Sequence, residues 1–501
     1  MKKEIIVNKE FQETRVAILN NGVLEEFYIE RGEAEGLVGN IYKGKVKTIL
    51  PGIAGAFIDI GIHKNGFLIT SEKISPFVLE DEPHLLDTDM FTRNKKGQNQ
   101  QKISDALKTG QELIMQVVKE PYGVKGPRIT TNVSLPGRYM VLTPHQAHFG
   151  ISRRIDDERE RRRIKDILEI LEVPAGMGFI VRTAGLGKGK IEFQRDLRYL
   201  LNLWKNIKTL SSSKTAPVLL HKEYDIILRT IRDSFTEDVD KFVVNSKEQF
   251  KRIMHFVHIL CPHLKKKVIL YLGNEDVFEK FSVEQQVDKL YQTRVDLKSG
   301  GYVVIEPTEG LAAIDVNSGK FVGKKNLEDT VFNVNMEAAD EIAKQIRMRD
   351  LGGIIIIDFI DMDKESHRNR VYQKFLEVLK FDRARTRVLP VSEIGLIQMT
   401  RQRIRSSIES KMYEACRYCK GRGSIKSALT VSILAIRKVK NVLKDLHRRS
   451  SACLSVHPDV AWKLLNEQRS AISYLEERYR SKIVINSDSK RHVEDISIEV
   501  S

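Results

Sequence analysis

Two apolar segments of the sequence end in acidic residues that could bind a metal ion. Asp315 lies late in the apolar segment 312–316, and Asp358 ends the isoleucine run 354–357. Alternation in the first segment predicts a strand on which Asp315 and Asn317 share a face. If the two strands are neighbours, the carboxylates converge at the carboxyl ends, where open α/β sheets bind ligands. Carboxylate oxygens without His or Cys suit Mg²⁺ or Mn²⁺, and acids that cap turns or pair with basic residues are the plainer alternative.

A third acid, Asp361, lies close beyond Asp358. In an extended chain it would point to the opposite face, so we expect it outside the carboxylate pair.

The chain of 501 residues carries 83 Lys and Arg against 67 Asp and Glu, a net charge of +16. Such basicity favours a polyanionic partner, and nucleic acid, an anionic membrane surface and the ribosome all fit. Together with a magnesium site, it suggests phosphodiester chemistry.

Cys416 and Cys419 form a Cys-x-x-Cys pair among glycines, the pattern of half a structural zinc site. Zinc needs four ligands, and the other cysteines, Cys261 and Cys453, lie far away in the sequence. Either these complete the site within one chain, or a second copy of the chain supplies another pair. A turn without metal and a redox pair are the alternatives. The redox alternative is weaker, because we expect no thioredoxin-like βαβ surroundings.

Aromatic and basic side chains could hold a nucleic acid strand. Alternation in the segment 56–60 places Phe57 on the wet face of a strand, where its ring can stack on a base. Phe67 is ambiguous, and a core position is its alternative. Arg182 and Thr183 end another strand before a glycine-rich loop, and guanidinium, hydroxyl and free backbone N–H groups suit a phosphate. A surface ion pair would explain Arg182 as well.

Short strands and amphipathic helices must position these residues. Three strands are expected within residues 1–37, and glycine-punctuated strands from residue 39 predict a small β-barrel. The polar segment Ser75–Lys102 is expected to form a loop. Residues 295–400 are expected to be α/β, with the run 354–357 as a strand at the centre of a covered sheet. Helices are expected over 155–171, 191–207, 219–234, 326–351 and 363–380, and an αβ tail after residue 416.

Composition excludes several protein classes. Hydrophobic residues make up 41% and charged residues 30% of the sequence, the balance of a globular protein rather than a disordered or collagenous one. The longest apolar run, 351–357, is far shorter than the roughly 20 residues that span a bilayer. Four cysteines make no disulfide framework, and the first residues lack a signal-peptide pattern. We therefore expect a cytoplasmic protein without a transmembrane segment.

Several of these segments together resemble one family, the bacterial ribonuclease E/G endoribonucleases. The two most specific motifs are Asp-Val-Asn-Ser-Gly, within 312–319, and Ile-Ile-Asp-Phe-Ile-Asp-Met, at the end of the segment that begins at 333. The other segments that carry the resemblance are 150–154, 178–185 and the cysteine turn 416–423. The resemblance extends over nearly the whole chain. The chain shows no long disordered tail and carries Gly-Lys-Phe-Val-Gly at 319–323, so it is more similar to the ribonuclease G branch, with a short form of ribonuclease E as the alternative.

The resemblance implies a multidomain α/β and β fold with an S1-like OB-fold barrel, an RNase H-like subdomain, a deoxyribonuclease-I-like α/β catalytic subdomain, a zinc knuckle and a small αβ C-terminal domain. The RNase H-like subdomain is thereby discontinuous in sequence. The implied boundaries are 1–37 and 229–289 for the RNase H-like parts, 38–130 for the barrel, 131–228 for a 5′-sensor region, 290–412 for the catalytic subdomain, 413–424 for the zinc link and 425–501 for the C-terminal domain.

The same resemblance implies roles for the candidate metal ligands. Asp315 and Asp358 match the family's magnesium-binding aspartates, and Asn317 matches its supporting carboxamide. Cys416 and Cys419 match the knuckle through which two protomers share one zinc ion.

Six further residues match positions that contact RNA in the family. They are Arg182 and Thr183, which grip a 5′-monophosphate, Val141 beside them, and Phe57, Phe67 and Lys125 on the barrel.

The chain departs from the family pattern in two places. Arg417 stands where the family usually has proline, which affects the rigidity of the knuckle, and the loop 75–102 is longer than usual.

The sequence thus predicts a magnesium-dependent endoribonuclease that cuts single-stranded RNA to 5′-phosphate and 3′-hydroxyl ends and prefers 5′-monophosphorylated RNA. The expected substrates are ribosomal RNA precursors and mRNA, in rRNA processing and mRNA decay. We expect a homodimer around a shared zinc ion, with a homotetramer as an alternative. A non-catalytic RNA-binding protein is a second interpretation, although such a protein has no use for acids that repel an RNA backbone unless a cation intervenes. A zinc-linked scaffold is a third, and it predicts that any activity does not need magnesium.

Overall fold

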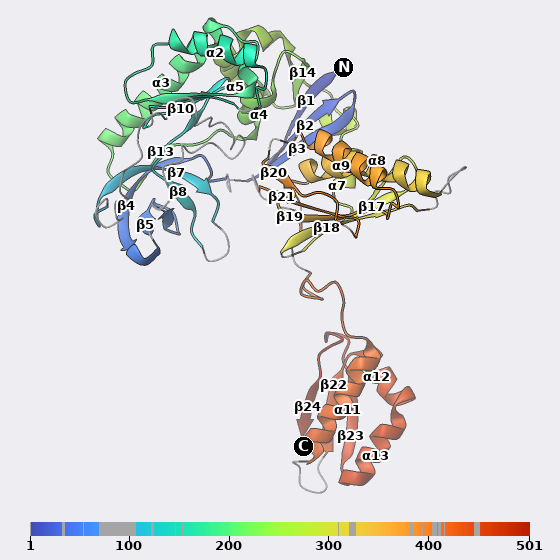
Figure 1. Ribbon diagram of the computed structural model, residues 1–501. Helices are drawn as coiled ribbons and strands as arrows, with labels where there is room; N and C mark the ends of the chain where they lie inside the picture. The colour runs from blue at the N-terminus through green and yellow to red at the C-terminus, as the bar shows by residue number, and fades with distance from the viewer. Residues whose placement is uncertain are drawn as a thin grey trace. The chain divides into compact units, whose positions relative to one another are not determined.

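Figure 1 shows the computed structural model of the chain. It describes residues 2–32, 36–53, 55–69, 107–121, 125–145, 147–152, 154–308, 310–319, 327–380, 382, 384–392, 394–402, 408, 412–414, 416–444 and 451–500. These form two compact units, Met1–Lys411 and Met412–Ser501. The loop expected over Ser75–Lys102 lies outside the described residues. None of the helices in these ranges is both long and apolar enough to cross a membrane.

The first sheet of the larger unit joins segments that lie far apart in the sequence. Its order is β15 (Val268–Leu270), β14 (Val239–Val244), β1 (Lys3–Lys9), β2 (Glu13–Asn20) and β3 (Val23–Arg31). Asn21 and Gly22, both with positive φ, make the two-residue turn between β2 and β3, as the Asn-Gly pair favours. Helices α4 (Ile226–Ser234) and α5 (Lys247–Leu260) pack on this sheet. The three strands expected near the start of the chain are confirmed.

Five strands form a closed barrel. They are β4 (Ile41–Leu50), β5 (Gly55–Asp59), β6 (Gly66–Ile69), β8 (Arg128–Thr130) and β7 (Glu112–Lys119). β7 pairs back onto β4, which closes the barrel and removes the free sheet edges. Ala56, Ile58 and Ile60 point inward and are fully buried. The predicted small barrel is confirmed, and its closure is consistent with an OB-like fold.

The helix expected over 219–234 is wrong in its first part. β13 (Val218–His221) is a strand that pairs antiparallel with β4 of the barrel. Helix α4 begins only at Ile226, where the Asp225 side chain accepts a hydrogen bond from the Leu228 N–H as an N-cap. A short apolar run fits strand and helix equally well, so the capping aspartate was the more informative signal.

A four-stranded sheet follows the barrel in sequence. Its order is β11 (Phe149–Ile151), β12 (Gly178–Val181), β10 (Met140–Thr143) and β9 (Leu135–Pro136). Helices α2 (Glu158–Glu169) and α3 (Lys190–Ser213) share a hydrophobic core with it and confirm the two helices expected there. After β12 the chain turns through the short 3₁₀ helix η2 (Thr183–Gly185), which places Arg182 at the junction of strand and turn.

The last sheet of the larger unit carries the candidate acids. Its order is β16 (Arg294–Asp296), β17 (Tyr302–Pro307), β18 (Leu311–Asn317), β19 (Gly353–Asp358), β21 (Leu396–Arg401) and β20 (Thr386–Val388). The short helices α6 (Val277–Lys280) and α7 (Glu284–Leu290) precede it in the chain. Helices α8 (Leu327–Met348) and α9 (Glu365–Leu379) pack on one face (Figure 1). Both helices were predicted from the sequence within a few residues at each end.

The isoleucine run is central in its sheet but is covered on one face only. β19 lies between β18 and β21, as expected for a buried β-branched strand. Ile355 and Ile357 are fully buried under α8 and α9, whereas Ile354 is 50% exposed. The prediction of a central strand is confirmed, and within the described residues the helices cover one face of the sheet. Both helices lie on the same side, and the other face carries Asp315 and Asp358.

The smaller unit is a compact αβ structure. Its sheet has the order β23 (Lys482–Ser487), β22 (Ser451–Val456) and β24 (Ser497–Val500). Helix α11 (Ala428–Lys444) packs on it together with α12 (Pro458–Trp462), the π-helical segment η4 (Lys463–Glu467) and α13 (Arg469–Tyr479). β22 and β23 are parallel, as the helical crossover between them requires. The chain is thus a multidomain mixed α/β protein, as the sequence predicted.

Candidate functional site

The two acids predicted to bind a metal ion lie next to each other. β18 and β19 are parallel neighbours, and Asp315 is paired in register with Asp358 at their carboxyl ends. Both side chains are exposed, while Ile314 and Ile357, one residue earlier in each strand, are buried. The expected convergence of the two aspartates is confirmed. The period-two alternation of each strand turns the apolar residues toward the helices and the acids toward solvent.

Asn317 lies on the same face and contacts the first acid directly. Its Nδ2 donates a hydrogen bond to Oδ2 of Asp315 at 2.7 Å. This contact fixes one carboxylate oxygen and leaves the other lone pairs of Asp315 for a further partner. The predicted pairing of a carboxamide with the acid two residues earlier is present in the structure.

Negative charge is concentrated at this edge of the sheet. Burial, followed by the charges of Asp315 and Asp361, raises the pKa of the Asp358 carboxyl above its ordinary value. The charge of Asp361 thus adds to that of the carboxylate pair, and the expectation that its side chain points to the opposite face stays a prediction. The strand ends at Asp358, and the side chains of Phe359 and Met362 turn into the core. Asp358 and Asp361 both remain exposed.

The donor set fits a hard divalent cation. Carboxylate oxygens at paired positions provide the ligand type that Mg²⁺ prefers, and a cation would relieve the repulsion among the acids. Within the described ranges no set of three or more His, Cys, Asp or Glu side chains is arranged to hold a metal ion by itself. The remaining positions around Mg²⁺ would fall to water and phosphate oxygens, as is usual for this ion.

Two phenylalanines stand together on the outside of the barrel. Phe57 on β5 is 37% exposed and is paired with Phe67 on β6, and their ring centroids are 5.3 Å apart. Phe57 thus lies on the wet face, as predicted, and Phe67 shares that face rather than the core. Lys125 is exposed and precedes β8, and the carbonyl of Pro127, directly before that strand, accepts a hydrogen bond from the Phe67 N–H. Phe57 and Phe67 thus lie on neighbouring strands of the barrel, and Lys125 lies in the segment that leads into the strand next to β6.

Arg182 is buried and held by internal partners. Its Nη1 donates to Asp233 Oδ1 and to the Gly137 carbonyl oxygen, both at 2.7 Å. Asp233 also accepts two hydrogen bonds from Arg232, so the acid is shared between two guanidinium groups. Sequence reasoning missed Asp233, because it lies in α4 and no local pattern connects it to β12. Charge-assisted bonds of this kind fix the orientation of the Arg182 fork.

Thr183 and Val141 differ in their access to a ligand. Thr183 begins η2 beside Arg182 and is half-buried. Val141 lies in β10 directly opposite Ile180 of β12 and is buried. The sheet thus brings Val141 next to the strand that ends in Arg182. Its buried side chain presents no surface to a ligand in this conformation.

The glycine-rich loop after Arg182 is bonded internally. The N–H groups of Gly185, Leu186 and Lys188 donate to carbonyls within the loop and its preceding turn. The N–H of Gly187 donates to Glu160 in α2 at 2.7 Å, and the N–H of Gly189 donates to Glu192 in α3 at 3.0 Å. The expectation of free backbone N–H groups is wrong for residues 185–189. Two of the five acceptors, Glu160 and Glu192, are side chains of the helices on either side of the loop.

Glu160 is expected to stabilise this loop in a pH-dependent manner. Hydrogen bonds from Arg163 and from the Gly187 N–H lower the pKa of Glu160 from 4.5 to about 2. A lowered folded-state pKa adds stability above pH 4.5, and that stability is lost as the pH falls toward about 2. Glu160→Gln should therefore lower the thermal midpoint near neutral pH, and the difference from wild type should shrink on acidification.

Thermal unfolding of both proteins near pH 7, 5 and 3 would measure this effect. Glu169→Gln, at an exposed acid of the same helix, is the matched control and should change the midpoint little at any pH. A difference between wild type and Glu160→Gln that stays constant from pH 7 to pH 3 would contradict the assignment.

The cysteine pair lies on a turn that favours thiolate. Hydrogen bonds from the backbone N–H groups of Cys419 and Tyr418, followed by the Cys419 thiol, lower the pKa of Cys416. His492 holds the turn by a hydrogen bond to the Tyr418 carbonyl at 2.7 Å. The sulfur of Cys416 is exposed, which fits a ligand shared with a second chain. The donor set therefore fits half of a tetrahedral zinc site.

The two other cysteines do not complete this site within the described residues. Cys261 is buried at the C-terminal end of α5 in the larger unit, and Cys453 lies in β22 of the smaller unit. Neither belongs to a metal-binding group with the Cys416–Cys419 turn in the described part of the chain.

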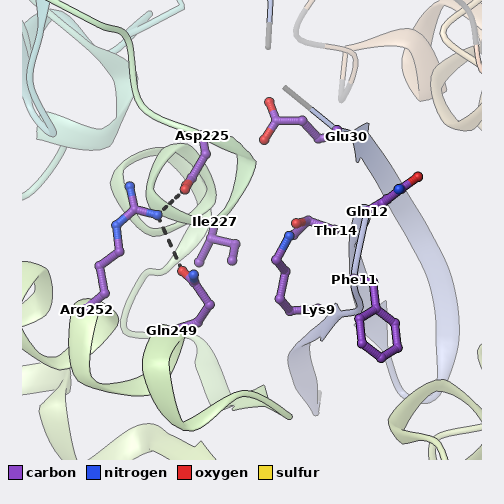
Figure 2. A pocket seen from close by; sticks show the side chains of 10 residues that line it. Lys9, Phe11, Gln12, Thr14, Glu30, Asp225, Ile227, Gln249 and Arg252 are labelled. Carbon is purple, nitrogen blue, oxygen red and sulfur yellow. Dashed lines mark hydrogen bonds and ion pairs between the residues drawn. The ribbon is translucent and has the colours of Figure 1, made fainter. Parts of the chain in front are cut away.

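A cavity of about 600 Å³ lies beside the first sheet (Figure 2). Its lining residues are Lys9, Phe11, Gln12, Thr14, Glu30, Gly32, Asp225, Ile227, Gln249 and Arg252. Asp225 and Gln249 accept hydrogen bonds from Arg252, and Glu30 accepts one from Arg229. The lining residues belong to none of the strands that carry Asp315 and Asp358. The cavity is therefore separate from the candidate metal site.

The chain combines a positive net charge, an OB-like barrel and two paired acids at strand ends. These features together are typical of an enzyme that acts on nucleic acids. Residues 134–404 match the Ribonuclease E/G family, and residues 415–501 match the RNase E/G, Thioredoxin-like domain. The chain therefore belongs to the ribonuclease E/G family of endoribonucleases, and the resemblance seen in the sequence is confirmed.

Relatives in two branches of the family match nearly the whole chain. Ribonuclease G of Haemophilus influenzae is 39% identical over 468 residues, which are 93% of this chain and 92% of that protein. Ribonuclease G of Escherichia coli K12 is 38% identical over 481 residues, 95% of each chain. Ribonuclease E of the same strain is 37% identical over 481 residues, which are 95% of this chain and 44% of that protein.

The second match corrects one expectation about the cysteine pair. We expected no thioredoxin-like surroundings, yet residues 415–501 match a thioredoxin-like domain. The pair itself precedes the first helix of that unit, α11, which begins only at Ala428. The strands that the structure describes in the smaller unit, β22 to β24, all follow the pair in the chain.

Proposed function

We propose that the chain is a magnesium-dependent endoribonuclease that cuts single-stranded RNA to 5′-phosphate and 3′-hydroxyl ends. The single observation that carries this proposal is the in-register pairing of Asp315 and Asp358 at the ends of β18 and β19, with Asn317 bonded to Asp315. Ribosomal RNA precursors and mRNA are the proposed substrates, in rRNA processing and mRNA decay. The names of the ribonuclease G relatives support an RNA substrate.

The residues of the site have distinct proposed roles. Asp315 and Asp358 would hold Mg²⁺, which when bound supplies charge neutralisation at the phosphate and lowers the pKa of a bound water. Asn317 orients the Asp315 carboxylate through its 2.7 Å hydrogen bond. Water attacks phosphorus in line with the 3′ oxygen, the bond from phosphorus to that oxygen breaks, and the phosphate stays on the 5′ end of the downstream product.

The remaining contacts to RNA are proposed from the geometry of the barrel and of the Arg182 turn. Phe57 and Phe67 form a two-ring surface on which bases can stack, with Lys125 nearby for the backbone. Arg182 and Thr183 are proposed to recognise a 5′-monophosphate, with Val141 supporting the strand pairing beside them. A triphosphate adds bulk and charge, and we propose that the turn at Arg182 and Thr183 accommodates only a single phosphate.

The assembly and the finer domain assignment are proposals as well. We propose an RNase H-like subdomain (1–37 and 229–289), an S1-like barrel (38–130), a 5′-sensor region (131–228), a deoxyribonuclease-I-like catalytic subdomain (290–412), a zinc link (413–424) and a C-terminal domain (425–501). Cys416 and Cys419 are proposed to bind zinc with the same pair of a second copy, which gives a homodimer. Four free cysteines in the chain fit a reducing compartment such as the cytoplasm.

Cleavage of a defined oligonucleotide tests the proposed function. A single-stranded RNA with a 5′-monophosphate is incubated with the protein in Mg²⁺ or in EDTA, and the ends of the products are identified. We expect internal cuts with 5′-phosphates in Mg²⁺ and none in EDTA. The same RNA with a 5′-hydroxyl should be cut more slowly. Tight RNA binding without cleavage in either buffer would instead support a non-catalytic RNA-binding protein.

A further inference from the structure

The segment 359–364, between β19 and α9, determines where the acids at the strand end lie. It follows Asp358 directly and contains Asp361. Phe359 and Met362 are buried in the core beneath it, and Phe359 packs edge-on against Phe375 of α9. Two buried side chains thus anchor the segment while the two acids face solvent.

Asn335 of α8 binds the peptide groups in the middle of this segment. Its Nδ2 donates to the Ile360 carbonyl at 2.7 Å, and its Oδ1 accepts from the Ile360 N–H at 3.1 Å. The carboxamide thereby satisfies both backbone groups of one residue, as a neighbouring strand would. Only one orientation of the amide allows both bonds, so its direction is defined. Ile360 lies between the two acids in the sequence.

Other side chains of the two helices hold the remainder of the segment. Glu328, in the first turn of α8, accepts hydrogen bonds from the N–H groups of Asp363 and Lys364 and from His367 Nδ1. Arg368 donates to the carbonyls of Met362 and Asp363. The position of Asn335 differs from these, because its bonds act on the part of the segment nearest to Asp358.

Asn335 is an unusual residue at its position in the helix. It is fully buried on the apolar stripe of α8, beside Val334 and Ala338. A buried carboxamide costs free energy unless its hydrogen bonds are made, and an apolar side chain would pack there without that cost. The residue is thus suited to binding the backbone of Ile360 rather than to filling the core.

We propose that Asn335 is a positioning residue of the metal site. By fixing the Ile360 peptide it holds the backbone between Asp358 and Asp361 in place, so that Asp358 stays beside Asp315 in a geometry ready for a divalent cation. This inference rests on the proposed function for its catalytic consequence, although metal binding itself can be measured separately. Removing a residue that orients metal ligands commonly lowers metal affinity or activity by about 10- to 100-fold.

Manganese binding provides the first test. Free Mn²⁺ is titrated with the full-length protein and followed by its electron paramagnetic resonance signal, with Asp358→Asn as the reference for a damaged site. Asn335→Ala is expected to bind Mn²⁺ about tenfold more weakly than wild type. The Mg²⁺ concentration for half-maximal RNA cleavage should rise by a similar factor, while RNA affinity in EDTA stays unchanged. Asn335→Leu, which retains side-chain volume in the core, gives the same comparison if the alanine variant does not fold.

Gln345→Ala is the matched control. Gln345 is another buried carboxamide of α8, bonded to Glu341 and Arg349 and not to the segment 359–364. Its variant should bind Mn²⁺ like wild type. Wild-type affinity in both Asn335 variants, or an equal loss in Gln345→Ala, would overturn the inference.

Failure of the proposed function gives a different result. In that case wild type binds Mn²⁺ through Asp358 and cuts no RNA, and the inference is still decided by the Mn²⁺ affinities of the Asn335 variants. Manganese binding by wild type that does not depend on Asp358 would overturn both.

Discussion

Replacing Asp358 with asparagine is expected to slow RNA cleavage by about 10³-fold, equivalent to about 4 kcal/mol of transition-state stabilisation. The carboxamide has nearly the same shape, but it lacks the charge that is proposed to hold a divalent cation together with Asp315 on the neighbouring strand. The expected loss is in the cleavage step, because Asp358 lies where a phosphate would have to be neutralised. Single-turnover cleavage of a 5′-monophosphorylated RNA at saturating Mg²⁺ measures it.

Stability provides a second measurement on the same variant. Asp315 and Asp361 repel the ionised Asp358 carboxylate and contribute to its raised pKa. A neutral asparagine removes this repulsion, so the thermal midpoint should stay the same or rise while activity is lost. Such a combination is typical of functional sites, where charges are kept at a cost in stability.

The control for this prediction is Asp340→Asn. Asp340 is an exposed acid on α8 that pairs with Lys374 of α9, away from the strand ends. It should retain wild-type cleavage, because an exposed ion pair contributes little. Near wild-type cleavage by Asp358→Asn would contradict the proposed metal site. Equal losses in the two variants would point to a general effect of charge on RNA binding.

The acid pair could be predicted from the sequence because local rules determine it. Apolar alternation around Asp315 and the isoleucine run before Asp358 each define a strand and the face of its last residue. Convergence then required one assumption, that the strands are neighbours, and the register of β18 and β19 confirms it. The face of Phe57 followed from the same alternation.

The prediction for the glycine-rich loop failed where the chain departs from regular geometry. The N–H groups after Arg182 were expected to be free, but Glu160 and Glu192 accept hydrogen bonds from two of them. The outcome depends on side chains of the helices α2 and α3, which the period and composition of the loop do not contain.

Contacts between residues that lie far apart in the sequence could not be predicted from any local sequence pattern. The Arg182–Asp233 pair joins residues 51 positions apart, and β1 pairs with β14 across more than 200 residues. Asn335 did leave a signal, a polar residue on the apolar stripe of a predicted helix. That signal marks a buried hydrogen-bonding position, but only the structure identifies Ile360 as its partner.

Arg182→Ala is expected to remove the preference for a 5′-monophosphate, reducing the ratio of cleavage rates for 5′-monophosphorylated and 5′-hydroxyl RNA by about tenfold or more. A hydrogen bond to a charged group contributes roughly 1.5–3 kcal/mol, and a bidentate contact to phosphate lies at the upper end. The rate for 5′-hydroxyl RNA should change little, because Asp315 and Asp358 lie in a different sheet. Parallel single-turnover rates for the two RNAs measure the ratio.

The burial of Arg182 requires a second variant for this prediction. Truncation leaves Asp233 with Arg232 as a remaining partner, so the charge of Asp233 is still compensated, and thermal unfolding would show any loss of structure. Thr183→Val keeps the Arg182–Asp233 pair and removes only a hydroxyl, so it should lower the same ratio to a smaller extent.

Arg162→Ala, at an exposed arginine of α2, controls for the loss of one positive charge and should lower both rates equally. If the ratio survives in Arg182→Ala, then the guanidinium serves the fold through Asp233 and Gly137, and recognition of the 5′ end belongs elsewhere.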